Sequence, residues 1–224
     1  MEADRFDEAI GQFRLSLRLS QDHVQSHLGL AACYLAMGRE ADAVDPLQAY
    51  LAARPDHFLI RWHLADVFLR VGRSREARGQ LERFLIAAQM NPALGDDHVI
   101  RCHTRLMEIA EKQGDYYAEH LNRGIGLLLL AERKAELGDA DARRGAEELL
   151  CKAAAELTLS ELTRPSEARP AWYLYRVWTA LAQRHPAQRW LCTARNRATP
   201  GTMTPAEMNA LHFTAHAIDP IGKR

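Results

Sequence analysis

Ten histidines are spread along the 224-residue chain, and two pairs of them have a spacing that could bind a metal ion. His23 and His27, like His212 and His216, are four residues apart, so both imidazoles of a pair can lie on one side of a helix. Neither pair includes the glutamate of a His-Glu-x-x-His motif, and no third ligand is evident near His212 and His216. Because two ligands alone rarely hold zinc, we expect no metal and no cofactor.

Three Asp-His dipeptides account for several of these histidines without a metal. Asp22-His23 and Asp56-His57 stand at equivalent points of a sequence repeat, and Asp97-His98 stands at the matching point of a later segment. The sequence predicts turns at these places, with the dipeptides capping the helices that follow.

Motifs for catalysis are absent from the sequence. It contains no Gly-x-Ser-x-Gly, no Gly-x-x-x-x-Gly-Lys and no Gly-x-Gly-x-x-Gly followed by a strand. The cysteines are scattered, with no Cys-x-x-Cys pair for zinc or redox chemistry: Cys33, Cys102, Cys151 and Cys192. No pair of carboxylates stands out as an acid and a base. We therefore expect a protein that is not an enzyme.

Charge is spread unevenly, although the formal net charge is zero. Residues 164–198 contain seven arginines and one glutamate, whereas residues 1–163 contain 20 Lys and Arg against 26 Asp and Glu. Trp172, Tyr173 and Trp190 lie between these arginines, a pattern that could bind RNA or another acidic partner. The same stretch could equally face the acidic first two thirds of its own chain, or solvent. Because a neutral protein attracts phosphate only weakly, nucleic acid ranks below protein as the expected partner.

A sequence repeat organises the elements that would carry any such site. Leu30, Ala31, Tyr34, Gly38, Ala43 and Leu47 have counterparts one period later in Leu64, Ala65, Phe68, Gly72, Ala77 and Leu81. The glycines stand where one helix must end and the chain must turn back, and Ala43 and Ala77 allow two helices to approach closely. The period is about 34 residues, a length that predicts a stacked array of helix pairs.

These residues, together with Pro55 at the end of one copy, resemble the tetratricopeptide repeat. The resemblance is clear over residues 4–91, weak over 100–114, and beyond that extends only to further helices. His27 and Arg61 stand where the family favours a large aromatic residue, with Trp62 one place late. The resemblance implies an all-α fold, a right-handed α–α superhelix built as a solenoid of antiparallel helix pairs.

We expect one solenoid with three parts. Residues 1–91 form regular units, the first of them incomplete, and residues 92–163 form helix pairs that have drifted in length. Residues 164–224 form a C-terminal helix pair and a capping helix, which opens with the capping box Thr204-Pro205-Ala206-Glu207. The expected helices span about 5–19, 24–37, 40–53, 58–71, 74–89, 99–113, 116–137, 141–161, 170 onward, 186–197 and 205–218.

The resemblance implies recognition of a protein or peptide in a concave groove that the first helix of each unit lines. The corresponding positions are Gln25, Leu28, Ala32 and Leu35, then Leu59, Trp62, Asp66 and Arg70, then Arg101, Thr104, Glu108 and Glu111. We single out as partner-binding residues Leu28, Leu35, Trp62, Asp66, Arg70, Arg101 and Glu108. Trp62 is the best single anchor, since a large aromatic side chain contributes most when a partner desolvates it. For Leu28 and Leu35, burial by a preceding helix or by neighbouring units is an equal alternative.

The function favoured by the sequence is a non-catalytic scaffold for protein interaction. One alternative is the recognition part of a larger enzyme, because the chain starts inside a repeat; another is RNA binding through residues 164–198. Exposed repeat ends often stack, so a homodimer is also consistent with the pattern. The longest apolar run, 127–131, is far shorter than the roughly 20 residues that cross a bilayer. The acidic N-terminus has no signal-peptide core, and we expect a cytoplasmic protein.

Overall fold

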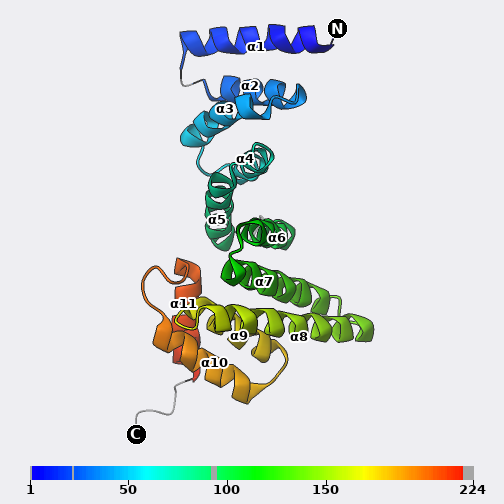
Figure 1. The fold of residues 1–224 in the computed structure, drawn as a ribbon, viewed down its shortest axis with the longest axis vertical. Helices are drawn as coiled ribbons and strands as arrows, with labels where there is room; N and C mark the ends of the chain where they lie inside the picture. The colour runs from blue at the N-terminus through cyan, green and yellow to red at the C-terminus, as the bar shows by residue number, and fades with distance from the viewer. Residues whose placement is uncertain (1, 22, 92–94, 219–224) are drawn as a thin grey trace. The chain divides into compact units, whose positions relative to one another are not determined.

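The computed structural model describes residues 2–21, 23–91 and 95–218, which form eleven helices and, apart from an isolated bridge between Pro200 and Met203, no strand (Figure 1). The all-α fold of helix pairs expected from the repeat is confirmed, and the bounds agree with expectation to within a few residues. In chain order the helices are α1 Glu2–Leu19, α2 Val24–Ala36, α3 Glu40–Ala53, α4 Phe58–Arg70, α5 Ser74–Met90, α6 Asp96–Gln113, α7 Tyr116–Ala135, α8 Ala140–Thr163, α9 Ala168–Ala180, α10 Arg184–Arg197 and α11 Pro205–Ile218. No helix in this described part combines the length and the apolar character that spanning a bilayer requires.

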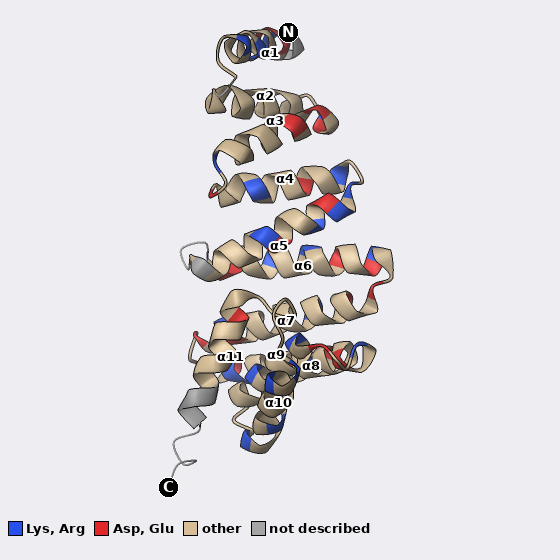
Figure 2. Ribbon diagram, turned by 90° about the vertical axis from the view of Figure 1, so that its left-hand side faces the viewer, with Lys and Arg blue, Asp and Glu red and all other residues tan. Residues whose placement is uncertain are grey.

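The chain divides into two compact units, Met1–Ala87 and Ala88–Arg224. In the first unit α2 pairs with α3 and α4 with α5, and Figure 2 shows α2, α3 and α4 as successive layers. The small residues at the helix crossings are fully buried, each with 0% of its surface exposed: Ala31, Ala43, Ala65 and Ala77. Their size allows the helices to approach closely, as the sequence predicts for Ala43 and Ala77.

Both helix pairs of the first unit turn back through a left-handed glycine. Gly38 and Gly72 have φ angles of 68° and 78°, which side chains with a Cβ adopt only at a cost. The next amide closes the turn: Arg39 N–H donates to the Tyr34 carbonyl oxygen, and Arg73 N–H to that of Phe68, both at 2.8 Å. Glycine therefore recurs at these turns because the backbone there has a left-handed conformation.

In the second unit, α7 and α8 pack along each other over a shared apolar core. Gly124 of α7 lies against Leu157 of α8, which is fully buried. The Ser160 hydroxyl of α8, also buried, donates to the backbone carbonyl oxygen of Tyr117 at 3.1 Å. The absence of a side chain at Gly124 thus allows these helices to approach closely.

The pair formed by α9 and α10 repeats the geometry of α4 and α5. Leu64, Ala77 and Leu81 have buried counterparts, all at one constant offset, in Leu174, Ala187 and Leu191. The turn is also the same, since Gln183 N–H donates to the Trp178 carbonyl oxygen at 2.9 Å. At the position of the turn glycine stands Ala182, with a φ of 56°. The expected C-terminal helix pair therefore has the same buried positions and the same turn as α4 and α5, with alanine in place of the turn glycine.

Ala182→Gly is expected to raise the free energy of unfolding of the second unit by about 0.5–1 kcal/mol. Alanine pays a steric cost in the left-handed region that glycine avoids, and Ala182 is exposed, so no packing is lost. Urea unfolding followed by circular dichroism measures the change. As a matched control, Ala180→Gly at the end of α9 lowers stability by up to about 1 kcal/mol. Equal destabilisation by both changes would contradict the strain at Ala182.

Candidate functional site

The partner-binding residues predicted in the first unit lie on α2 and α4. Leu28 and Leu35 are half-buried. Leu59 is 47% exposed. Trp62 is half-buried, and its ring meets that of Phe84 edge-on, with 5.7 Å between centroids. Because Phe84 is fully buried, Trp62 has a fixed base on the core and retains an accessible part.

Charged side chains flank this apolar surface. Asp66 is half-buried, and Arg70 is exposed with a 3.7 Å ion pair to Glu40 that contributes little in solvent. Arg61, where the family favours an aromatic residue, donates to Gln80 Oε1 at 2.9 Å and to the Pro55 carbonyl oxygen at 2.7 Å. Burial, and after it the charge of Arg83, lowers the pKa of Arg61. Arg61 thus links the start of α4 to α5 and to the preceding turn. Trp62, the next residue, is aromatic and keeps part of its surface accessible.

The other predicted residues belong to the second unit, on α6. Arg101 and Thr104 are exposed, and Glu111 is exposed near the end of the helix, before Gly114. Glu108 is half-buried and accepts a hydrogen bond from Arg105 at 3.0 Å. These residues give α6 a polar face within the second unit.

The histidines have structural partners of their own. His23 and His57 occupy the residue before α2 and α4, as predicted, but neither side chain caps its helix. Instead, their Nδ1 atoms lie 2.7 Å from Ser26 Oγ and 2.6 Å from the Tyr50 hydroxyl, respectively. Both histidines therefore occupy the predicted N-cap positions without a capping hydrogen bond from their side chains, and Asp22 lies outside the described residues.

The remaining histidine predictions concern α6 and α11. Asp97 and His98 lie inside α6, which begins at Asp96 after Gly95, so their predicted place in a preceding turn is wrong. His212 is exposed on α11, and the side chain of His216 lies outside the described residues. Among the described residues, no group of three or more His, Cys, Asp or Glu side chains is placed to hold a metal ion.

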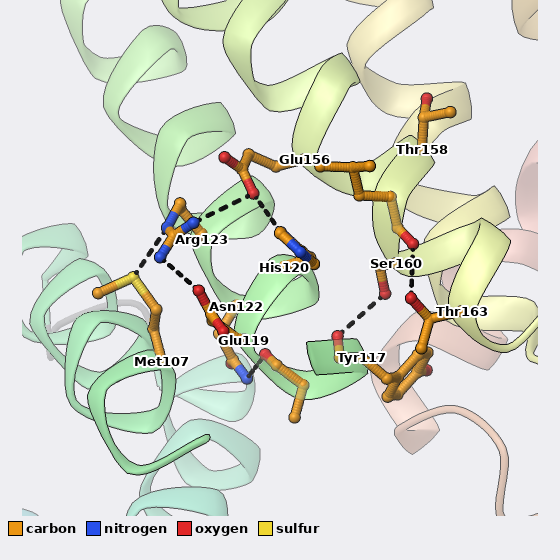
Figure 3. A network of polar contacts seen from close by, with 12 residues as sticks. Met107, Tyr117, Glu119, His120, Asn122, Arg123, Glu156, Thr158, Ser160 and Thr163 are labelled. Atoms are coloured by element: carbon orange, nitrogen blue, oxygen red, sulfur yellow. Dashed lines mark hydrogen bonds and ion pairs between the residues drawn. The ribbon is translucent and has the colours of Figure 1, made fainter. Parts of the chain in front are cut away.

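A polar network joins α6, α7 and α8 within the second unit (Figure 3). Glu156 Oε2 accepts a hydrogen bond from His120 Nδ1 at 2.6 Å and lies 3.5 Å from Arg123 Nη1. The Arg123 guanidinium also donates to Glu119 Oε1 at 2.7 Å and to Met107 Sδ at 3.4 Å. Only the Glu119–Arg123 pair, one helical turn apart, has a signature in the sequence. The contacts to Glu156 and Met107 come from other helices, and the network fastens α7 between its neighbours.

A second cluster ties α11 to α9. Glu207 Oε1 accepts from the Tyr173 hydroxyl at 2.7 Å and from Arg169 Nη2 and Nε at 3.0 and 3.2 Å. Its Oε2 accepts from Thr204 N–H at 2.8 Å while Glu207 N–H donates to Thr204 Oγ1 at 3.2 Å, so the predicted capping box is confirmed. Burial raises the pKa of Glu207, but the charge of Arg169 and these hydrogen bonds outweigh it, and the net pKa is lowered. Burial likewise raises the pKa of Tyr173.

His103 of α6 is the one fully buried imidazole among the described residues, with 4% of its surface exposed. Its Nδ1 lies 2.9 Å from Asn122 Oδ1, while Asn122 Nδ2 donates to the Ala118 carbonyl oxygen at 2.7 Å. Because the Asn122 oxygen therefore faces the ring, Nδ1 carries the proton of the neutral imidazole. Burial lowers the pKa of His103 to about 4, although the Asn122 hydrogen bond opposes the shift.

The arginine-rich stretch faces the chain's own acidic residues. Four of its seven arginines form ion pairs, namely Arg164 with Asp115, Arg169 with Glu207, Arg176 with Glu132 and Arg197 with Glu161. Trp172 and Tyr173 are each only 5% exposed, so they offer no stacking surface for bases. The remaining arginines, Arg184, Arg189 and Arg195, are exposed on α10. This arrangement favours the interpretation that the stretch balances charge within the chain.

Comparison with known proteins identifies the repeat. The family model described as tetratricopeptide repeat matches residues 1–57. No curated protein matches the chain. Among solved structures, the chain resembles MamA, with 16% identity, 86% of this chain and 88% of that chain covered, and a TM-score of 0.41. It also resembles PilW, a type IV pilus biogenesis factor, with 15% identity, 94% and 93% covered, and a TM-score of 0.41.

Human IFIT1, in a structure with m7Gppp-AAAA, is a third similar protein, with 14% identity and a TM-score of 0.46. The alignment covers 95% of this chain but only 50% of the IFIT1 chain. The repeat register, the buried alanines and the glycine turns agree with the family match, which assigns tetratricopeptide repeat sequence to residues 1–57.

Proposed function

We propose that the protein is a non-catalytic scaffold that binds a protein or peptide on the surface formed by α2 and α4. The observation that supports this most is the setting of Trp62. Its ring rests edge-on against the buried Phe84, and the neighbouring Leu59 is 47% exposed. A partly accessible aromatic residue on a rigid base contributes strongly to binding, because little side-chain entropy is lost when a partner covers it.

Polar residues supply the rim that an interface of this kind needs. Asp66 and Arg70 follow Trp62 along α4, and Arg70 is exposed. A partner that offers an apolar side chain to Trp62 and Leu59, and an acidic group to Arg70, matches this surface best. The polar face of α6, with Arg101 and Glu108, is a separate set of residues for partner contact in the second unit.

Trp62→Ala is expected to weaken partner binding by at least tenfold while helix content stays unchanged. The change removes the aromatic anchor but leaves the buried Phe84 and the small residues of the helix crossings in place. Affinity capture with the full chain as bait, followed by titration of the captured protein, measures the effect. Ile86→Ala is the matched control, because Ile86 is a 46% exposed apolar residue on α5.

A protein that is captured by the wild type and by the Ile86→Ala variant, and lost with Trp62→Ala, supports the α2 and α4 surface as the binding site. If Trp62→Ala instead lowers helix content, Trp62 belongs to the core. If the variant folds and retains every partner, binding takes place elsewhere on the chain.

A further inference from the structure

The C-terminal helix α11 binds α9 at Arg169, a position that corresponds to Leu59 in the candidate binding surface of α4. The register is set by the constant offset that relates the buried residues of the two helix pairs. In that register, Leu59, Trp62 and Asp66 correspond to Arg169, Trp172 and Arg176. The partner-facing side of the C-terminal repeat is therefore a basic and aromatic surface.

This surface is already occupied within the chain. The Arg169 guanidinium is paired with Glu207 of α11 at 3.0 Å, and Arg176 with Glu132 of α7 at 2.6 Å. Trp172 is 5% exposed and packs against Tyr175, with 5.4 Å between the ring centroids. In both views of the fold, α11 runs back beside α9 and α10 (Figures 1 and 2).

The contact between α11 and α9 has the chemistry of ligand recognition. A single oxygen, Glu207 Oε1, receives two guanidinium donors and one phenol donor. The other oxygen stays in the capping box of its own helix. Arg169 and Tyr173 thus bind a carboxylate in the first turn of a helix. Another helix with an acidic residue in its first turn can form the same hydrogen bonds.

Only a few of the described side chains anchor α11 to the rest of the unit. Met203 and Leu211 are buried in the core of the unit, whereas His212 and Phe213 are exposed, Phe213 by 78%. Seven residues link Arg197, the end of α10, to Pro205, the start of α11. A helix joined by one short linker and anchored through a few side chains can open without unfolding the helices on which it lies.

We propose that α11 is an intramolecular ligand of α9, and that its release opens a second binding site for a partner helix with a carboxylate in its first turn. The tethered α11 competes at a high effective concentration, so a partner in solution binds only when α11 is weakened or displaced. The proposal concerns the second unit and stands apart from the α2 and α4 surface, so the failure of one leaves the other untouched.

The test uses a fluorescently labelled peptide with the sequence of residues 199–218 as the probe and the full chain as the receptor. The Glu207→Gln protein, which keeps the shape of the side chain but loses its charge, is expected to bind this peptide at least tenfold more tightly than the wild type does. A peptide with Gln at position 207 loses that gain. Adding Tyr173→Phe to the Glu207→Gln protein removes one donor and weakens binding of the original peptide about tenfold. The control Glu148→Gln, at an exposed position on α8, binds like the wild type.

Hydrogen exchange of the wild-type chain gives a second readout that needs no variant. Amides of residues 208–213 are expected to exchange at least a hundredfold faster than those around Leu174 in α9. Equal protection of the two helices would show that α11 is an inseparable part of the core and would overturn the proposal. So would equal peptide affinity for the wild-type and Glu207→Gln proteins. A Glu207→Gln protein that dimerises would assign the site to a second copy of the chain in place of a partner helix.

Discussion

Gly124→Ala is expected to lower the free energy of unfolding of the second unit by about 1–3 kcal/mol. A Cβ at this position would lie 2.6 Å from Leu157 Cγ, 2.9 Å from Leu157 Cδ2 and 3.3 Å from the Leu157 backbone nitrogen. Leu157 is fully buried, and its backbone is held within α8. The added methyl group therefore has to separate two long helices or force a strained rotamer on the leucine.

Leu157→Ala is expected to cost about 2–5 kcal/mol, because it removes a buried side chain and leaves a cavity between α7 and α8. The double variant tests the contact directly. With alanine at both positions, the methyl group at 124 enters part of the vacated space, and the two approaches below 3.0 Å, to Leu157 Cγ and Cδ2, are removed. The combined loss is then smaller than the sum of the two single losses.

Urea unfolding followed by tryptophan fluorescence reports mainly on this unit, since three of the four tryptophans lie in it: Trp172, Trp178 and Trp190. Gly126→Ala is the matched control on the same helix. A Cβ there would meet only His103 Cβ, at 3.9 Å, which is an ordinary contact. Alanine also favours the helix, so the control gains up to about 1 kcal/mol. Equal losses for the two glycine variants, or strict additivity in the double variant, would contradict the role of Gly124.

The fold could be predicted from the sequence because its strongest signals are local or periodic. Gly38 and Gly72 adopt left-handed angles that few other residues tolerate, and the buried alanines recur with the period of the repeat. The capping box of Thr204 and Glu207 is likewise a short-range relation. Each of these patterns states a backbone or packing requirement within one helix pair, which is the scale that sequence reasoning reaches.

The sequence predictions were wrong or incomplete in two places. One is the segment that interrupts the repeat register, and the other is the turn in which alanine replaces glycine. Asp97-His98 was assigned to a turn because similar dipeptides precede α2 and α4, yet α6 begins at Asp96. Acidic residues are favourable in the first turn of a helix as well as before it, so this sequence fits both places. The repeat in α9 and α10 is hidden for a related reason. Its turn has Ala182 in place of glycine, and its offset from α4 and α5 is not a whole number of repeat periods.

The candidate site could be placed on its helices by register, but its surroundings could not be predicted. Trp62 packs on Phe84, and Glu156 binds His120, although the members of each pair lie far apart in the sequence. Such contacts depend on how helices cross, which no short pattern encodes. Composition alone also left open whether the arginine-rich stretch faces RNA or the chain itself. The ion pair of Arg169 with Glu207 is the kind of long-range contact that favours the second of these interpretations.

Acidification from pH 7 to pH 4 is expected to cost the second unit about 3 kcal/mol through His103 alone. The folded state holds the pKa of this imidazole at about 4, against an ordinary value of 6.5. Between these values the unfolded chain binds a proton that the folded chain does not, so the free energy of unfolding falls as the pH falls. Each pH unit in this window is worth about 1.4 kcal/mol, and the contribution is complete above pH 6.5.

The charged groups around His103 act on its pKa in opposite directions. Burial is the main cause, and Arg169 and Arg176 on α9 also disfavour the imidazolium, whereas Asn122 and the Glu207 carboxylate favour it. Glu207 titrates in a separate window. Its pKa is lowered in the folded state, so its contribution is present above the ordinary value of 4.5 and is lost as the pH falls below it. The decrease in the free energy of unfolding between pH 6.5 and pH 5 is therefore due to His103.

His103→Gln separates this effect from the titration of every other group. Glutamine can still donate to Asn122 but has no proton to gain, so the variant is less stable than the wild type at pH 7 and loses about 1.5 kcal/mol less between pH 6.5 and pH 5. Urea unfolding at a series of pH values, followed by tryptophan fluorescence, gives both curves. Because all other ionisable groups are common to the two proteins, the difference between the curves isolates the imidazole. Parallel curves would mean that His103 is reached by water in the folded state and titrates near its ordinary pKa.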